Sequence, residues 1–163
     1  MNRTRRNALF AFGLFIPALA FGQTSWPGFM PTLQPGQSRS TVPAPPCPAD
    51  MSIEPQSSEL PAEKVKWSGQ WAGWACPGRS CDTKLDVEKV TAQGASVVYS
   101  IGSTQGQREV GRVDAQFVGN ELHFVSPSGN KIAYRIRSDG NLEYFSTDKT
   151  ELWIVGILSK RRQ

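Results

Sequence analysis

Histidine and cysteine are scarce in this chain of 163 residues, which contains one histidine and three cysteines. The single histidine, His123, excludes most hydrolases that need a histidine base and metal sites built from several imidazoles. The chain also lacks a G-x-S-x-G motif, so it has no nucleophile elbow of the α/β-hydrolase type. We therefore assign no catalytic residue, no metal ligand and no cofactor, and the sequence favours a non-catalytic protein over an enzyme.

Long apolar runs are also rare, and the one that stands out is Ala8–Ala20, which follows a basic start. As a helix these residues would rise about 20 Å, which is short of a hydrocarbon core of about 30 Å, and Pro17 interrupts them. Small residues permit cleavage after Ala20 or Gly22. We therefore predict that residues 1–22 are a bacterial signal peptide and that the protein is periplasmic or secreted, with no stable membrane span after cleavage. The arginine pair at the start resembles a twin-arginine signal, so the export route stays open.

Proline is concentrated in one segment, since nine of the 12 prolines fall in Gln23–Pro61. This segment has no periodic apolar pattern, and such a chain buries too little apolar surface to offset its ordering entropy. We predict a disordered linker with polyproline character over 23–61. Residues 62–159 hold 11 basic and 11 acidic side chains, so the pI of about 9.1 comes from the two ends. We expect no nucleic-acid partner.

The three cysteines divide into a close pair and a remainder. Cys76 and Cys81 enclose the turn-forming tetrapeptide Pro-Gly-Arg-Ser, and in an oxidising compartment this spacing predicts a local disulfide. Closing so short a loop stabilises by about 2 kcal/mol in the chain-entropy account. Cys47 remains, either as a free thiol or as an intermolecular disulfide that would make a dimer.

From residue 62 onward the sequence consists of short runs rich in β-branched and aromatic residues, separated by turn residues at intervals of about ten. The predicted strands are Trp67–Ala75, Thr83–Thr91, Ala95–Ile101, Glu109–Phe117, Glu121–Val125, Lys131–Arg137, Leu142–Ser146 and Glu151–Leu158. Gly119-Asn120 and Asp139-Gly140 supply residues that tolerate the positive φ of tight hairpins. No helix of normal length fits between these runs.

Alternation along the runs gives most of them one apolar face. Val97, Tyr99 and Ile101 share a face, and Tyr134 shares one with its apolar neighbours two residues away on either side. Consecutive antiparallel strands of this kind hide the apolar face and remove exposed edges by closing on themselves. We therefore predict an all-β domain at 62–163, an eight-stranded antiparallel up-and-down barrel in which the first and last strands pair. A two-sheet β-sandwich is the alternative.

The first predicted strand carries the motif Gly69-x-Trp71. Here the sequence resembles the calycin group of lipocalin-like and avidin-like barrels, which carry Gly-x-Trp on strand one. In that group a basic residue after the last strand packs across the tryptophan and closes the barrel floor. The resemblance implies this role for Lys160, Arg161 or Arg162, of which we assign Arg161. No biotin site and no long first loop are present, so the ligand chemistry of those families does not carry over.

Two tryptophans, Trp74 and Trp153, fall on the strand positions opposite to the inferred core. We expect them to be exposed and to form a surface for a ligand or partner. Asp86 and Glu88 are expected to be solvated strand positions. The sequence thus predicts an exported β-barrel that binds a small molecule or glycan, and the alternative is a protein-interaction or inhibitor module that acts through loops and exposed aromatics. The identity of the ligand and the existence of a cavity stay open.

Overall fold

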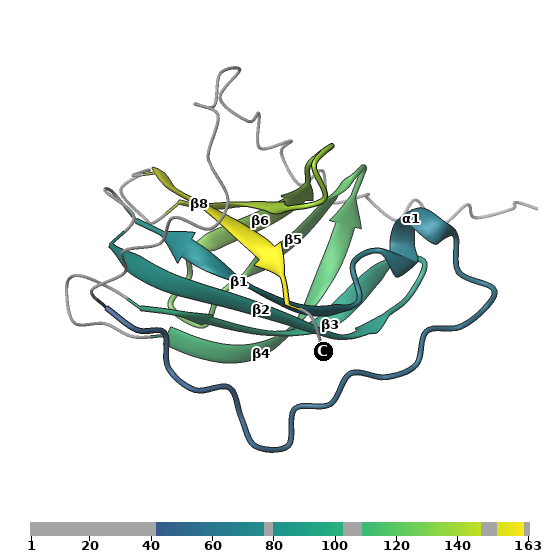
Figure 1. The fold of residues 1–163 in the computed structure, drawn as a ribbon, viewed down its shortest axis with the longest axis horizontal. Helices are drawn as coiled ribbons and strands as arrows, with labels where there is room; N and C mark the ends of the chain where they lie inside the picture. Colours follow the sequence, from purple (N-terminus) through teal and green to yellow (C-terminus); the bar gives the residue numbers. More distant parts are fainter. Residues whose placement is uncertain (1–41, 77–79, 103–108, 148–152, 162–163) are drawn as a thin grey trace, which may run out of the picture. The chain divides into compact units, whose positions relative to one another are not determined.

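A computed structural model of the chain describes residues 42–76, 80–102, 109–147 and 153–161. The predicted signal peptide and the first part of the proline-rich segment lie outside these residues. Eight strands follow one short helix, and they close into an antiparallel barrel in up-and-down order (Figure 1). The elements are α1 (Ala62–Val65), β1 (Gly69–Ala75), β2 (Cys81–Val90), β3 (Gly94–Ile101), β4 (Glu109–Val118), β5 (Glu121–Val125), β6 (Lys131–Ile136), β7 (Leu142–Thr147) and β8 (Trp153–Lys160).

The first and last strands close the barrel. β1 pairs antiparallel with β8, with Trp71 opposite Lys160 and Gly73 opposite Leu158. A Cβ atom at Gly73 would collide with the backbone carbonyl of Ile157, so the two strands approach this closely only because residue 73 is glycine. The predicted up-and-down barrel is confirmed, and the β-sandwich alternative is wrong.

The barrel interior is lined by alternate side chains of all eight strands. The fully buried members include Leu85, Val97, Tyr99, Leu122, Leu142 and Leu158. They occupy the positions that the period-two pattern assigns to the apolar face. Within the part of the chain described, no helix is long and apolar enough to span a membrane.

We call the end of the barrel that carries α1 the closed end. Trp67 and Trp71 fill it, and the Trp71 indole nitrogen donates to the Trp67 carbonyl at 3.0 Å. The Lys160 ammonium lies 5.1 Å from the centroid of the Trp71 ring and donates to the carbonyl of Lys66 at 3.1 Å. The covering cation is therefore Lys160, and the assignment to Arg161 is wrong. The β1–β8 register sets this outcome, because Lys160 is the residue paired with Trp71.

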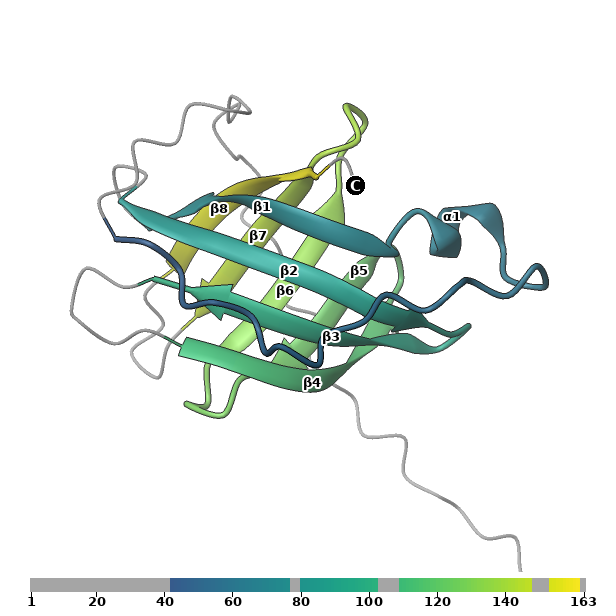
Figure 2. The ribbon, with the colours of Figure 1, turned by 60° about the horizontal axis from the view of Figure 1, so that its bottom comes forward.

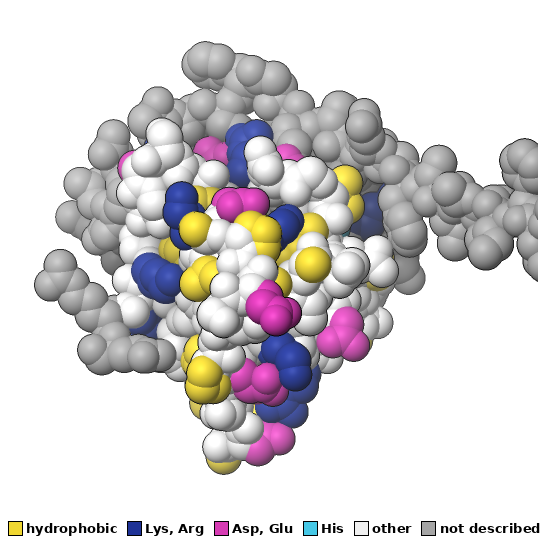
Figure 3. Space-filling view, turned by 90° about the vertical axis from the view of Figure 1, so that its right-hand side faces the viewer, with side chains coloured by type: hydrophobic (Ala, Val, Ile, Leu, Met, Phe, Trp, Pro, Cys, Tyr) yellow, Lys and Arg dark blue, Asp and Glu magenta, His cyan; other side chains and the backbone are white. Residues whose placement is uncertain are grey.

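The surface at the closed end mixes charges of both signs with apolar side chains, as Figure 3 shows for its described part. Lys64 of α1 places its ammonium 3.6 Å from the centroid of the Phe117 ring. Phe117 in turn packs against Trp67, with ring centroids 5.7 Å apart. The closed end is thus sealed by aromatic rings that two lysines cover.

The opposite end of the barrel, which we call the mouth, holds the disulfide. Cys76 and Cys81 are bonded with their Cα atoms 5.6 Å apart, and they join the end of β1 to the start of β2. The predicted bridge is confirmed. Residues 77–79 of this bridged loop lie outside the described residues, as do residues 103–108 and 148–152 in two other connections.

Residues 42–56, which we call the strap, lie along the outer face of β2 and β3 (Figure 2). The amide of Asp82 donates to the Val42 carbonyl at 3.0 Å, and the Ser100 hydroxyl donates to the Pro45 carbonyl at 2.7 Å. Further along, the Glu54 amide donates to the backbone carbonyl of Glu88 at 2.7 Å. For the described residues 42–56 the expectation of a disordered linker is therefore wrong, because buried polar groups on the barrel hold the strap.

Two of those polar groups are the carboxylates of β2, Asp86 and Glu88, which are 4% and 9% exposed. Asp86 accepts from the Cys47 thiol at 2.9 Å, and Glu88 accepts from Arg112 at 2.8 Å and from the Ser52 amide at 3.2 Å. The expectation that these carboxylates are solvated is wrong. Carboxylates this deeply buried need donors, and the strap supplies two of them, the Cys47 thiol and the Ser52 amide.

Candidate functional site

Three tyrosines gather inside the barrel, and we call Tyr99, Tyr134 and Tyr144 the tyrosine cluster. They come from β3, β6 and β7 and are 1%, 0% and 3% exposed. Phe124 connects them, because its ring centroid lies 5.1 Å from that of Tyr99 and 6.2 Å from that of Tyr134. Tyr134 and Tyr144 face each other across the β6–β7 pair, with ring centroids 5.3 Å apart. The cluster is a continuous set of aromatic faces with phenol groups.

Glu109, the first residue of β4, faces this cluster from the mouth. Its carboxylate accepts from the Tyr99 hydroxyl at 2.7 Å and from the Ser128 hydroxyl and amide at 3.1 and 3.3 Å. Tyr99 reaches it by crossing Gly111, where an added Cβ would lie 2.9 Å from the tyrosine ring. A glycine at residue 111 therefore lets a β3 side chain contact a β4 carboxylate two residues away.

Tyr134 differs from the other two tyrosines of the cluster in the state of its hydroxyl group. It is buried and has no hydrogen-bond partner in the part of the chain described. Thr83 of β2 donates its own proton to the carbonyl of Ser100 at 3.3 Å. Its side chain is close enough to Tyr134 to lower the pKa of the phenol slightly against the effect of burial, but the two hydroxyls do not meet the geometry of a hydrogen bond. A buried hydroxyl left unpaired costs about 1–3 kcal/mol, so an unpaired group at this depth calls for a functional explanation.

The electrostatic environment keeps the phenols of the cluster neutral. Burial raises the pKa of Tyr144 to about 12, and the charge of Glu109 adds to the effect. Burial also raises the pKa of Tyr99, together with the hydrogen bond to Glu109 and its charge, and burial raises the pKa of Tyr134 well above its ordinary value. The cluster therefore offers neutral hydroxyls that can both donate and accept hydrogen bonds.

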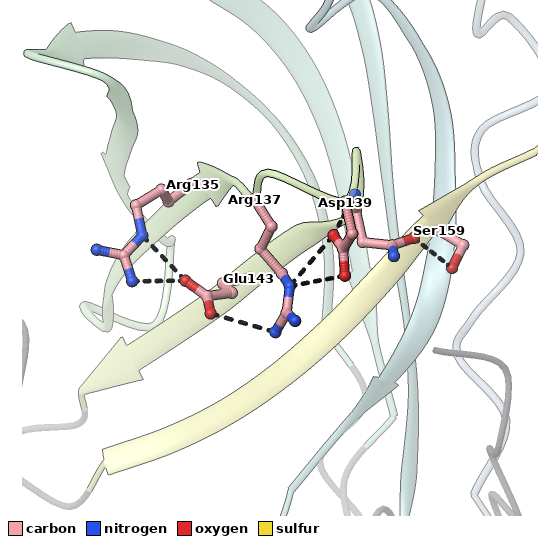
Figure 4. Close-up of polar contacts among 6 residues, drawn as sticks. Arg135, Arg137, Asp139, Glu143 and Ser159 are labelled. Carbon is pink, nitrogen blue, oxygen red and sulfur yellow. Dashed lines mark hydrogen bonds and ion pairs between the residues drawn. The ribbon is translucent and has the colours of Figure 1, made fainter. Parts of the chain in front are cut away.

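Several other charged side chains of the barrel form ion pairs on its outer face. Figure 4 shows Glu143 of β7 between Arg135 and Arg137, with carboxylate oxygens 2.6 and 3.4 Å from the two guanidinium groups. Arg137 also contacts Asp139 at 3.1 Å. His123 lies 2.7 Å from the Glu121 carboxylate on β5. The arginine pairs link β6 to β7 and to the turn after β6, and the His123 contact lies within β5, so we assign all of them to the architecture.

The expected aromatic surface is not present at Trp74. This side chain is 3% exposed, although it alternates with Gly73 and Ala75, which face the interior. Its partner on β8, Ile157, is also buried. The expectation that Trp74 is exposed is wrong, because the outer face of the barrel is itself covered at this position. The backbone of Trp153 pairs with Thr147, and its side chain lies outside the description.

No aromatic side chain of the described residues is exposed. The large apolar side chains that do reach solvent are Val110, Val118 and Val125. The same residues contain no group of three or more histidine, cysteine or acidic side chains arranged to hold a metal ion. Among the described residues, the tyrosine cluster together with Glu109 is therefore the candidate site.

Comparisons with known proteins identify no family for this chain. The chain matches no protein-family model and no curated protein. Among solved structures it is similar to one described as the de novo design of a fluorescence-activating beta barrel. The two chains are 12% identical, and the match covers 63% of this chain and all of the other, with a TM-score of 0.48.

From the sequence we placed Tyr99 and Tyr134 on apolar strand faces and assigned them no functional role, and we gave Tyr144 no assignment. Their signal in the sequence was a hydroxyl-bearing ring on the apolar face of β3 and β6, at Tyr99 and Tyr134. Because a phenol needs a partner when buried, such a ring at a core position can indicate a polar site. Glu109 had a related signal, since it is a carboxylate on the same face as Val113 and Ala115.

Proposed function

We propose that the protein is an exported, non-catalytic module that binds a small molecule at the mouth of its barrel, on the tyrosine cluster. The observation that carries the proposal is the Tyr134 hydroxyl, which is buried and unpaired within the described residues. A ligand that exchanges a hydrogen bond with this hydroxyl recovers its cost of about 1–3 kcal/mol. Trp67 and Trp71 fill the closed end, so the ligand enters from the mouth.

We also propose that residues 1–22 direct export and that the barrel is calycin-like. The Cys76–Cys81 disulfide supports an oxidising compartment. The packing of Lys160 across Trp71, next to Gly69, supports the relationship to calycins. An interaction or inhibitor module acting through exposed aromatics has less support, since Trp74 is buried.

The binding proposal is tested with the full exported chain and a set of aromatic fragments of one size, comprising alcohols, amines and carboxylates. Ligand-observed NMR detects complexes with a Kd of about 1 mM, which corresponds to about 4.1 kcal/mol of binding free energy. We expect at least one fragment to bind the wild type and to bind Tyr134→Phe at least about fivefold more weakly. Phenylalanine keeps the ring and removes the hydroxyl.

The matched control is His123→Ala, which changes an outer-face side chain and should leave fragment binding unchanged. If no fragment binds the wild type at millimolar concentration, the proposed function is wrong. If fragments bind the wild type and Tyr134→Phe equally, binding takes place elsewhere and the assignment of the site is wrong.

A further inference from the structure

The two ends of the barrel interior carry opposite charges. Among the described residues, the charged side chains on inward-facing strand positions are Glu109 at the mouth and Lys160 at the closed end. Lys160 is accounted for, because its ammonium covers Trp71 and donates to the carbonyl of Lys66. Glu109 forms no ion pair with any described lysine, arginine or histidine. Its donors are the neutral hydroxyl of Tyr99 and the hydroxyl and amide of Ser128.

Several acidic side chains on the outer face differ from Glu109 because each of them forms an ion pair with an arginine. On the outer face, Glu88 and Asp50 share Arg112, and Glu143 lies between two arginines. The carboxylate oxygens of Glu109 have room for more than three donors, since a carboxylate offers about four acceptor positions. Its Oε2 atom accepts from the Ser128 hydroxyl, within the described residues, and from no nitrogen. A negative charge that faces the interior thus keeps spare acceptor capacity.

The aromatic side chains around Glu109 add to the negative potential. The ring series Tyr99–Phe124–Tyr134–Tyr144 presents several π faces, which attract a cation and repel an anion. The hydroxyl of Tyr134 provides an acceptor for a ligand N–H. Burial of the rings raises the strength of these interactions relative to water.

We infer that the site at the mouth selects a small organic cation of the ammonium class, with Glu109 as the residue that sets the charge of the ligand. The inference rests on the proposed function and specifies its ligand. The ammonium group pairs with the Glu109 carboxylate, an N–H donates to the Tyr134 hydroxyl, and the apolar body of the ligand packs on Phe124 and Tyr144. A carboxylate ligand of the same size would be repelled by the Glu109 carboxylate, which pairs with no cation of the described residues.

The test uses three probes with one skeleton, 2-phenylethylammonium, 2-phenylethanol and phenylacetate, and isothermal titration calorimetry on the full chain at pH 7. We expect the ammonium to bind at least about tenfold more tightly than the alcohol, and phenylacetate to bind most weakly. In Glu109→Gln, the Kd of the ammonium should lie within about threefold of the Kd of the alcohol. Asp114→Asn, which removes the same charge from the outer face of the same strand, should keep the wild-type preference.

A second measurement on the wild type keeps the test decisive if Glu109→Gln does not fold. Raising the ionic strength from about 0.01 to about 0.5 M should weaken the binding of the ammonium and leave that of the alcohol unchanged. If the alcohol binds as tightly as the ammonium, or if Glu109→Gln keeps the preference, the inference is wrong and the proposed function stands. If none of the probes binds and the fragment screen is also blank, both are wrong.

Discussion

The thiol of Cys47 donates a hydrogen bond to the carboxylate of Asp86 at 2.9 Å, and this contact joins the strap to the outer face of β2. The half-buried position of the thiol raises its pKa to about 11, with the hydrogen bond to Asp86 and the charge of Asp86 adding to the effect. Cys47 is therefore held as a protonated donor. A covalent dimer through Cys47, which the sequence left open, would require the thiol to leave Asp86.

The reactivity of Cys47 should report on this contact. A thiol with a pKa of about 11 in place of about 9 has roughly 100-fold less thiolate at pH 8, and the thiolate is the reactive form. We expect iodoacetamide to alkylate Cys47 correspondingly slowly in the native protein, as followed by intact mass. Asp86→Asn should accelerate the reaction at least about tenfold, whereas Asp114→Asn should not change it. Equal rates in all three proteins would show that the strap does not hold the thiol in solution.

The closed end should depend on both members of the Trp71–Lys160 pair. Trp71→Ala removes a large buried ring, so we expect the free energy of unfolding to fall by about 3–5 kcal/mol. Lys160→Met keeps the length of the side chain and removes the cation, and we expect a loss of about 1 kcal/mol. Urea denaturation measures both. Arg161→Met serves as the control, and an effect larger than that of Lys160→Met would return the covering role to Arg161.

Barrel closure should be sensitive to a single methyl group at Gly73. Alanine at this position would place its Cβ against the backbone carbonyl of Ile157, and backbone atoms of two paired strands have little room to move. We expect Gly73→Ala to lower the free energy of unfolding by about 3 kcal/mol. Ala72→Ser, on the outer side of the same strand, should change it by less than about 0.5 kcal/mol. Similar stabilities for the two variants would contradict the close β1–β8 approach.

The tyrosine cluster should make the protein sensitive to alkaline pH. A tyrosine whose pKa is higher in the folded than in the unfolded protein stabilises the fold fully below the unfolded value of about 10, and this stabilisation is lost as the pH rises. Since the pKa of Tyr144 is raised to about 12, we expect the free energy of unfolding to decrease between about pH 10 and pH 12. Tyr144→Phe should make the decrease of the free energy of unfolding with pH less steep, by up to about 1.4 kcal/mol per pH unit.

This prediction is checked by urea denaturation of the wild type and Tyr144→Phe at several values between pH 8 and pH 11.5. The difference between the two proteins at pH 8 gives the cost of the substitution itself, and its change with pH isolates the titration of the phenol. If the free energies of unfolding of the two proteins change with pH in parallel, Tyr144 ionises freely in the folded state and the prediction is wrong.

The local features of the sequence determined the strands, the turns and the disulfide. Alternation over runs such as Lys131–Arg137 has a period of two that only a half-buried strand satisfies, and residues such as Asp139-Gly140 allow the backbone of a hairpin. Eight such runs left a barrel or a sandwich, and the barrel is the arrangement found. The Cys76–Cys81 pair is local as well, because its members are five positions apart in the sequence.

The tertiary structure decided what depends on register and on contacts between distant segments. The pairing of β1 with β8 placed Lys160 rather than Arg161 over Trp71, since a shift of one residue moves a side chain to the other face. The strap lies on the barrel because Asp86 and Glu88 accept its donors, a match between residues about 35 to 40 apart that no local pattern contains. The tyrosine cluster likewise exists only after β3, β6 and β7 curve around one interior, because closure brings together side chains that the sequence keeps apart.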